Sequence, residues 1–167
     1  MGREVRMVPP DWEHPKKDNV RDRRGGNYKP LFGRSYAKEA REWLDNVIAW
    51  ENGTDPDAAE HKAAHPYWWE WDGGSPDPED YMPDWPAEQR THLQMYEDTT
   101  EGTPISPVFA TPEELAHWLA DNGASSFGDM TATYEQWLST CKRGYAPCAI
   151  IQGGVITSGV ASMAAER

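Results

Sequence analysis

Residues 91–122 read THLQMYEDTTEGTPISPVFATPEELAHWLADN, and this stretch contains two β-strand signals followed by a complete helix start. Leu93 and Met95 alternate with more polar neighbours, a period of two that predicts a β-strand. The segment TPISPVF is also extended in character, and Pro104 and Pro107 place it at the edge of a sheet or in a loop. The stretch therefore predicts two adjacent extended segments.

A helix is predicted directly after these segments. Thr111 is a suitable N-cap, Pro112 fits the first helical position, and Glu114 stands where the glutamate of a capping box belongs. The apolar pattern then continues until Gly123. This part of the chain therefore predicts strand, strand and helix in that order.

Helix and hairpin patterns extend on both sides of this stretch. Ser35 can cap an amphipathic helix that stops at Gly53, and Thr131 can cap another helix that ends at Gly144. The glycine pair at 153–154, between two β-branched runs, is typical of a hairpin. The helix after Ser35 has an apolar face made of Tyr36, Ala40, Trp43, Leu44, Val47, Ile48 and Trp50.

The order of these elements predicts an α+β fold: a single compact domain with about three helices and a small antiparallel sheet. Residues 1–34 are rich in proline, glycine and charge, so we expect an extended, partly irregular arm in which REVRMV resembles a strand. We expect residues 35–167 to form the domain, with an irregular acidic, tryptophan-rich insertion at about 54–90.

The negative charge is concentrated in the middle of the chain. The net charge is −12, and residues 51–101 hold 14 acidic side chains against only Lys62 and Arg90. Such a surface repels phosphate backbones and attracts basic proteins. The charge therefore disfavours direct nucleic-acid binding and predicts a partner with a basic surface.

No apolar run is long enough to cross a bilayer, and the N-terminus has no apolar leader pattern, so we expect no membrane association. Cys141 and Cys148 do not form a C-x-x-C pair, which favours reduced thiols in a cytoplasm. No glycine-rich phosphate-binding motif occurs, and we expect no cofactor. The sequence gives no signal for the oligomeric state.

Residues 81–138 resemble a family of small proteins encoded in bacteriophage genomes. The resemblance rests on EGTPISPVF followed closely by TPEELAHWLADN, together with VPPDWEHP near the start of the chain. It implies a phage or prophage origin and a working life in the cytoplasm of the bacterial host. It supplies no catalytic residues.

Two polar clusters are candidates for chemistry. His92, Glu97, Glu101 and Ser106 are the weak catalytic candidates of a small enzyme, although strand alternation places His92 and Glu97 on opposite faces. His61 and His65 have the H-x-x-x-H spacing of zinc ligands, but Lys62 stands where a metalloprotease has glutamate, and two histidines alone do not make a metal site.

The segment HPYWWEWDGGSPDPEDYMPDWP at residues 65–86 is the candidate binding surface. Tryptophan is a frequent interface anchor, and the surrounding acids suit arginine-rich surfaces. We expect most of the indoles to be buried, the acids to point outward and one tryptophan to stay exposed. The candidate residues are Trp68, Trp69, Trp71, Asp77, Glu79, Asp80, Asp84 and Trp85.

The sequence therefore favours a phage-encoded accessory protein over an enzyme. We expect it to bind a host protein through this acidic aromatic surface, and thereby to inhibit a nucleic-acid-handling or defence factor. The alternatives are a small enzyme with its site at residues 92–106, and a minor virion or assembly component.

Overall fold

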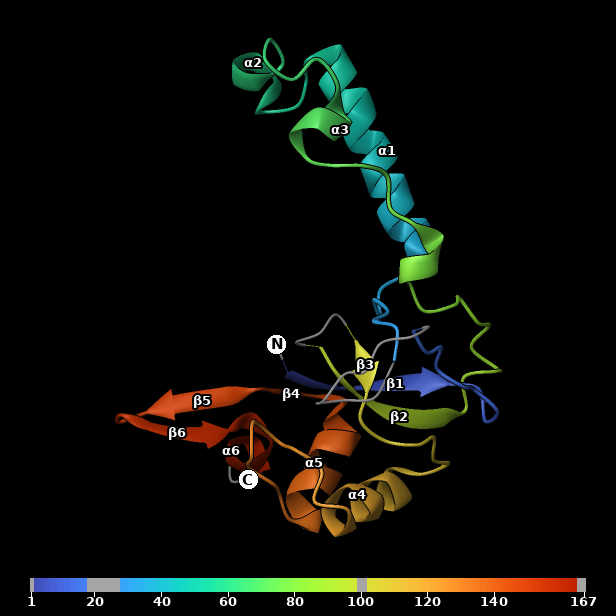
Figure 1. Cartoon of the computed structure of the whole chain (residues 1–167), viewed down its shortest axis with the longest axis vertical. Helices are drawn as coiled ribbons and strands as arrows, with labels where there is room; N and C mark the ends of the chain where they lie inside the picture. Colours follow the sequence, from blue (N-terminus) through green and yellow to red (C-terminus); the bar gives the residue numbers. More distant parts are fainter. Residues whose placement is uncertain (1, 18–27, 99–101, 165–167) are drawn as a thin grey trace. The chain divides into compact units, whose positions relative to one another are not determined.

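The structure is a computed structural model that describes residues 2–17, 28–98 and 102–164 (Figure 1). These residues form helices and an antiparallel sheet, which confirms the α+β class. The chain divides into two compact units: unit 1 contains Met1–Pro30 and Trp85–Arg167, and unit 2 contains Leu31–Asp84. The predicted boundary at residue 34 falls near the start of unit 2, and the predicted insertion covers the second half of that unit.

The main sheet of unit 1 has four strands in the order β3-β2-β1-β4, and all neighbouring pairs are antiparallel. The strands are β1 (Gly2–Val8), β2 (His92–Glu97), β3 (Thr103–Pro104) and β4 (Tyr145–Pro147). β1 lies between β2 and β4, so residues 2–8 belong to the sheet and not to an arm. β1 pairs with β2 from Arg3 opposite Glu97 to Val8 opposite His92, and with β4 from Gly2 opposite Pro147 to Glu4 opposite Tyr145.

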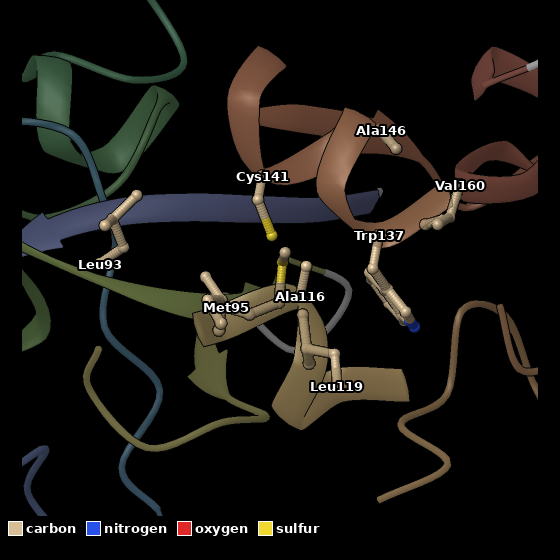
Figure 2. Packing of buried hydrophobic residues seen from close by; sticks show 9 residues of the cluster. Leu93, Met95, Ala116, Leu119, Trp137, Cys141, Ala146 and Val160 are labelled. Atoms are coloured by element: carbon tan, nitrogen blue, oxygen red, sulfur yellow. The ribbon is translucent and has the colours of Figure 1, made fainter. Parts of the chain in front are cut away.

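One face of β2 packs against three helices of unit 1. Leu93 and Met95 contribute to a buried cluster with the helices α4 (Pro112–Asp121), α5 (Tyr134–Arg143) and α6 (Gly159–Ala164), which lie on the same side of the sheet (Figure 1). Figure 2 shows how closely this cluster packs. Its buried members are Leu93, Met95, Leu115, Ala116, Leu119, Trp137, Cys141, Ala146 and Val160.

Helix starts follow the predicted chemistry with one correction. The Thr111 side chain accepts a hydrogen bond from the Glu114 N–H, and Glu114 accepts one from the Thr111 N–H, which confirms the capping box of α4. The cap of α5 is Thr133 and not Thr131, because Gln136 completes a second capping box with Thr133.

The C-terminal hairpin is confirmed. β5 (Ala149–Gln152) pairs with β6 (Val155–Ser158), and Gly153 and Gly154 both have positive φ angles, as a tight two-residue turn requires. α6 begins directly after the hairpin at Gly159, where a Cβ would collide with the carbonyl oxygen of Pro147. Only glycine therefore allows α6 to start against this backbone.

Unit 2 is built around one long helix, α1 (Tyr36–Asn52), with the Ser35 cap and the Gly53 stop predicted from the sequence. The short helices α2 (Ala58–His61), α3 (Trp68–Trp71) and η1 (Pro78–Asp80) follow. Trp50 is completely buried with Ala58 and Trp68, and its Nε1–H donates to the carbonyl oxygens of His65 and Pro66 at 3.2 and 3.3 Å. This aromatic cluster is the core of the unit.

One part of the predicted apolar face of α1 is not buried within this core. Leu44 and Ile48 are 48% and 50% exposed, whereas Trp43 and Val47 pack against the buried cluster. Only the side of α1 that packs against α2 and α3 contributes to that cluster. Leu44 and Ile48 lie on another side of α1 and remain exposed to solvent.

Across the three described ranges of the chain, no helix has both the length and the apolar character needed to cross a membrane.

Candidate functional site

Unit 1 contains a cavity of about 1010 Å³. Its lining comes from three parts of the unit: the segment at residues 12–16 with Tyr28, the strand β2 with the following segment at 104–108, and Trp118 of α4. The lining residues are Trp12, Glu13, His14, Pro15, Lys16, Tyr28, Gln94, Pro104, Ile105, Ser106, Pro107, Val108 and Trp118.

A buried hydrogen-bond network centred on Tyr96 supports this cavity. The Trp12 Nε1–H donates to the Tyr96 hydroxyl at 3.1 Å, and the hydroxyl donates to Gln94 Oε1 at 2.7 Å. Gln94 Nε2 in turn donates to the carbonyl oxygen of Ser106 at 2.8 Å. Because a carbonyl can only accept, this last bond fixes the orientation of the Gln94 amide.

His14 joins the network from the other side. Its Nε2 lies 2.6 Å from the Lys29 carbonyl oxygen, and its Nδ1 lies 3.2 Å from the Tyr96 hydroxyl. Nε2 must carry a proton, since the Lys29 carbonyl cannot donate one. In neutral His14, Nδ1 is therefore an acceptor that competes with Gln94 for the single proton of the Tyr96 hydroxyl.

A second proton on His14 would end this competition, but it would also bury a charge. Burial lowers the pKa of His14 below 6.5, the hydrogen bond to Lys29 opposes this, and the nearby Arg6 guanidinium lowers the pKa further. Burial likewise raises the pKa of Tyr96 to about 12, which keeps its hydroxyl protonated. The Arg6 guanidinium lies 4.4 Å from the Tyr96 ring centroid, in a cation–π arrangement.

The lowered pKa of His14 predicts that the protein loses stability in mild acid. As the pH falls through 6.5, the unfolded state binds a proton before the folded state does, so the free energy of unfolding decreases until the pH lies below the folded pKa. Urea unfolding of the wild type and His14→Gln between pH 8 and 5 measures this effect. We expect the wild type to lose more stability than the variant; parallel curves would contradict the prediction.

The structure does not bring the predicted catalytic residues together. His92 and Glu97 lie at opposite ends of β2, about 16 Å apart at the usual rise of a strand. His92 Nδ1 is 2.9 Å from the Thr91 hydroxyl, and Glu97 forms an ion pair with Arg3 at 3.8 Å. Glu101 lies outside the described residues.

Among the described candidates His92, Glu97 and Ser106, only Ser106 lines the cavity. Its hydroxyl accepts a hydrogen bond from the Met95 N–H at 2.9 Å and donates one to the Pro107 carbonyl at 2.8 Å. A serine nucleophile needs a base that takes its proton. The hydroxyl of Ser106 instead holds two backbone segments together.

The two histidines considered for a metal both contact Trp71. The His61 ring stacks on the indole at a centroid distance of 4.0 Å, and the His65 ring lies at 5.5 Å. Nowhere in residues 2–17, 28–98 and 102–164 do three metal-binding side chains gather. Aromatic packing is therefore the role that the contacts of His61 and His65 support.

The tryptophans of the candidate binding segment differ in exposure. Trp68 is buried and Trp71 is half-buried, whereas Trp69 is 45% exposed and stacks on Tyr67, which is 48% exposed. This pattern agrees with the expectation of inward indoles and one exposed tryptophan. Trp85 belongs to unit 1, where it contacts Trp12 edge to face at 4.7 Å.

The acidic candidates are all exposed within unit 2; they are Asp77, Glu79, Asp80 and Asp84.

The rings of Tyr67 and Trp69 are almost parallel, with centroids 4.7 Å apart and an interplanar angle of 4°. Glu70, the next residue, accepts a hydrogen bond from the Tyr67 N–H and fixes the start of α3. We call the Tyr67–Trp69 pair the aromatic platform.

The network around Tyr96 was missed from the sequence. Gln94 and Tyr96 alternate with Leu93 and Met95 in β2, so they lie on the other face of the strand. Their side chains can form a hydrogen bond with each other when another segment covers that face. The covering segment contains Trp12 and His14, at a spacing of two that suits extended chain.

A scan against protein-family models finds no match to this chain, and neither do searches of curated proteins and of solved structures.

Proposed function

We propose that this chain is a non-catalytic accessory protein of a bacteriophage that binds a host protein in the bacterial cytoplasm. The contact surface is the aromatic platform together with the exposed acids of the same unit, and the partner presents a basic, arginine-containing surface. Binding there would inhibit a host factor that handles nucleic acid or acts in defence.

The exposed aromatic platform is the observation that carries this proposal. Two large rings stay about half exposed in a unit whose other aromatic side chains pack together. Such rings are typical anchors of protein interfaces, and an arginine guanidinium can stack on an indole while it pairs with a neighbouring carboxylate. The open stripe of Leu44 and Ile48 adds apolar surface to the same unit.

The charge of unit 2 supports a basic partner. Residues 31–84 contain 13 acidic and 4 basic side chains, a net charge of −9 out of −12 for the whole chain. A field of one sign accelerates association with an oppositely charged protein and repels nucleic acid. The polar residues 92–106 give less support to an enzyme, because the Ser106 hydroxyl is engaged by the backbone.

Charge reversal tests the proposal. A tagged protein is used to retain its partner from bacterial host lysate at low salt, and the retained partner is then titrated as a pure protein. Glu79→Lys combined with Asp80→Lys is expected to weaken binding about tenfold or more, because like charges then face each other. Added salt is expected to weaken wild-type binding through screening.

The matched control is Asp121→Lys combined with Asp129→Lys, which changes the net charge equally at exposed acids of unit 1. Trp69→Ala removes the anchor ring without changing the charge and is expected to weaken binding about tenfold. The proposal fails if no partner is retained, or if the unit 1 control weakens binding as much as the unit 2 reversal does.

A further inference from the structure

The cavity of unit 1 has a lining that is both apolar and aromatic, and it lies outside the surface proposed above. Trp12, Tyr28 and Trp118 supply aromatic rings, and the remaining apolar lining is Pro15, Pro104, Ile105, Pro107 and Val108. Its volume of about 1010 Å³ is at the upper end of the range for ligand pockets. The cavity is therefore large enough for a short peptide segment.

The lining carries the exposed charged side chains Glu13 and Lys16 and also three hydrogen-bond donors without an acceptor among the described residues. Gln94 is only 5% exposed, and its Nε2 carries two hydrogens, of which one donates to the Ser106 carbonyl. No group in the described parts of the chain accepts the second hydrogen. The Trp118 Nε1–H and the Tyr28 hydroxyl also have no acceptor among the described residues.

The acceptors beside Gln94 already take part in hydrogen bonds. Gln94 Oε1 accepts from Tyr96, and the Tyr96 hydroxyl accepts from Trp12. The Ser106 hydroxyl accepts from Met95 and donates to a carbonyl. A ligand that matches these donors and the apolar lining brings carbonyl acceptors and apolar surface.

A polyproline II helix meets all of these requirements. Proline has no backbone N–H, its carbonyls project into solvent without internal hydrogen bonds, and its rings offer flat apolar surface. Aromatic-lined grooves bind such segments in other proteins, and the stiff helix loses little entropy on binding. We propose that the unit 1 cavity binds a proline-rich segment of a partner protein in the polyproline II conformation.

Acetyl-decaproline amide is the probe that tests this site, with acetyl-(Gly-Ser)5 amide as a flexible peptide of equal length. Calorimetry measures the affinity, and ¹H–¹⁵N spectra follow the indole N–H groups of the nine tryptophans. We expect saturable binding of decaproline alone, with the largest shifts at Trp12 and Trp118 and none at Trp69. These shifts are measured on the wild-type protein, so they do not depend on the folding of a variant.

Trp118→Phe keeps an aromatic ring and removes the N–H donor, so we expect decaproline to bind about fivefold to tenfold more weakly. Trp69→Phe is the same change in unit 2, and we expect it to leave the affinity unchanged. The Trp137 indole signal reports whether the core of the Trp118→Phe variant is intact, since Trp137 is fully buried there.

The inference is overturned if decaproline does not saturate, if the Gly-Ser peptide binds equally well, or if Trp118→Phe binds as tightly as the wild type. Binding that shifts Trp69 instead of Trp118 would overturn it too. None of these results changes the expectation for the Glu79 and Asp80 charge reversals, so this site and the host-protein surface are tested separately.

Discussion

Trp50→Ala is expected to unfold unit 2. Trp50 is completely buried, packs edge to face on Trp68 at 5.5 Å, and donates from Nε1 to two backbone carbonyls. Removing a buried tryptophan side chain costs about 3–5 kcal/mol. A unit of this size, residues 31–84, has a total stability of roughly 3–8 kcal/mol, so the loss takes most of it.

Limited proteolysis measures this outcome, with the cleavage sites located by mass spectrometry and helix content followed by circular dichroism. We expect new cuts within residues 31–84 in the Trp50→Ala variant. Trp69→Ala is the matched control, because it removes the same side chain from a position that is 45% exposed, and we expect a stability change below about 1 kcal/mol. Equal protease resistance in the two variants would show that Trp50 does not hold this unit together.

Tyr96→Phe is expected to have the next largest effect. The change keeps the ring beneath Arg6 but removes the hydroxyl that joins Trp12, His14 and Gln94. The Gln94 oxygen and the Trp12 N–H then lose their partner, and an unsatisfied buried group costs about 1–3 kcal/mol. We expect the free energy of unfolding to fall by about 2–4 kcal/mol in urea titrations.

Tyr134→Phe provides the comparison for this result. Tyr134 stacks on His117 at 4.0 Å, and its hydroxyl makes no hydrogen bond with the described residues. We expect its loss to change the stability by less than about 0.5 kcal/mol. Equal unfolding midpoints for the two variants would mean that the Tyr96 hydroxyl contributes nothing to the fold.

The helices were predictable because their ends depend on local chemistry. Thr111 bonds to Glu114, Ser35 to Lys38 and Gly53 to Ala49, so each signal acts within a few residues of the chain, as does the glycine pair of the hairpin. Local signals of this kind are readable without knowing the tertiary structure. They are the reason that the α+β class followed from the sequence.

The strand character of REVRMV was predicted and β1 confirms it, but its place inside the sheet was not predicted because of its charged residues. Arg3 and Arg6 lie on opposite faces of the strand, yet both are buried, at 3% and 8% exposure. Arg3 donates to the Ser125 carbonyl at 2.8 Å, and Arg6 pairs with Glu4 at 2.9 Å and covers Tyr96. Buried arginines need partners from distant segments, and a single sequence does not reveal those partners.

The candidate cavity was only partly predictable for a related reason. Residues 92–106 were singled out for their polarity, and Ser106 does line the cavity. Gln94 and Tyr96 were not among the candidates, although Trp12 and His14 both bond to the Tyr96 hydroxyl and Gln94 lines the cavity. The residues that cover this strand face are more than 80 positions away in the sequence. Local sequence patterns therefore do not predict which segment covers it.

The position of unit 2 in the chain has a consequence for the order of events during translation. Unit 2 is continuous, so all of its partners are available once Asp84 has left the ribosome. β1 is made first but must wait for β2 and β4, because Val8 pairs with His92 and Gly2 with Pro147. Until then, both edges of the nascent β1 strand stay open to other chains, and contacts of such long sequence separation close slowly. We expect unit 2 to fold first on the ribosome and unit 1 to close around β1 only after β4 has been synthesised.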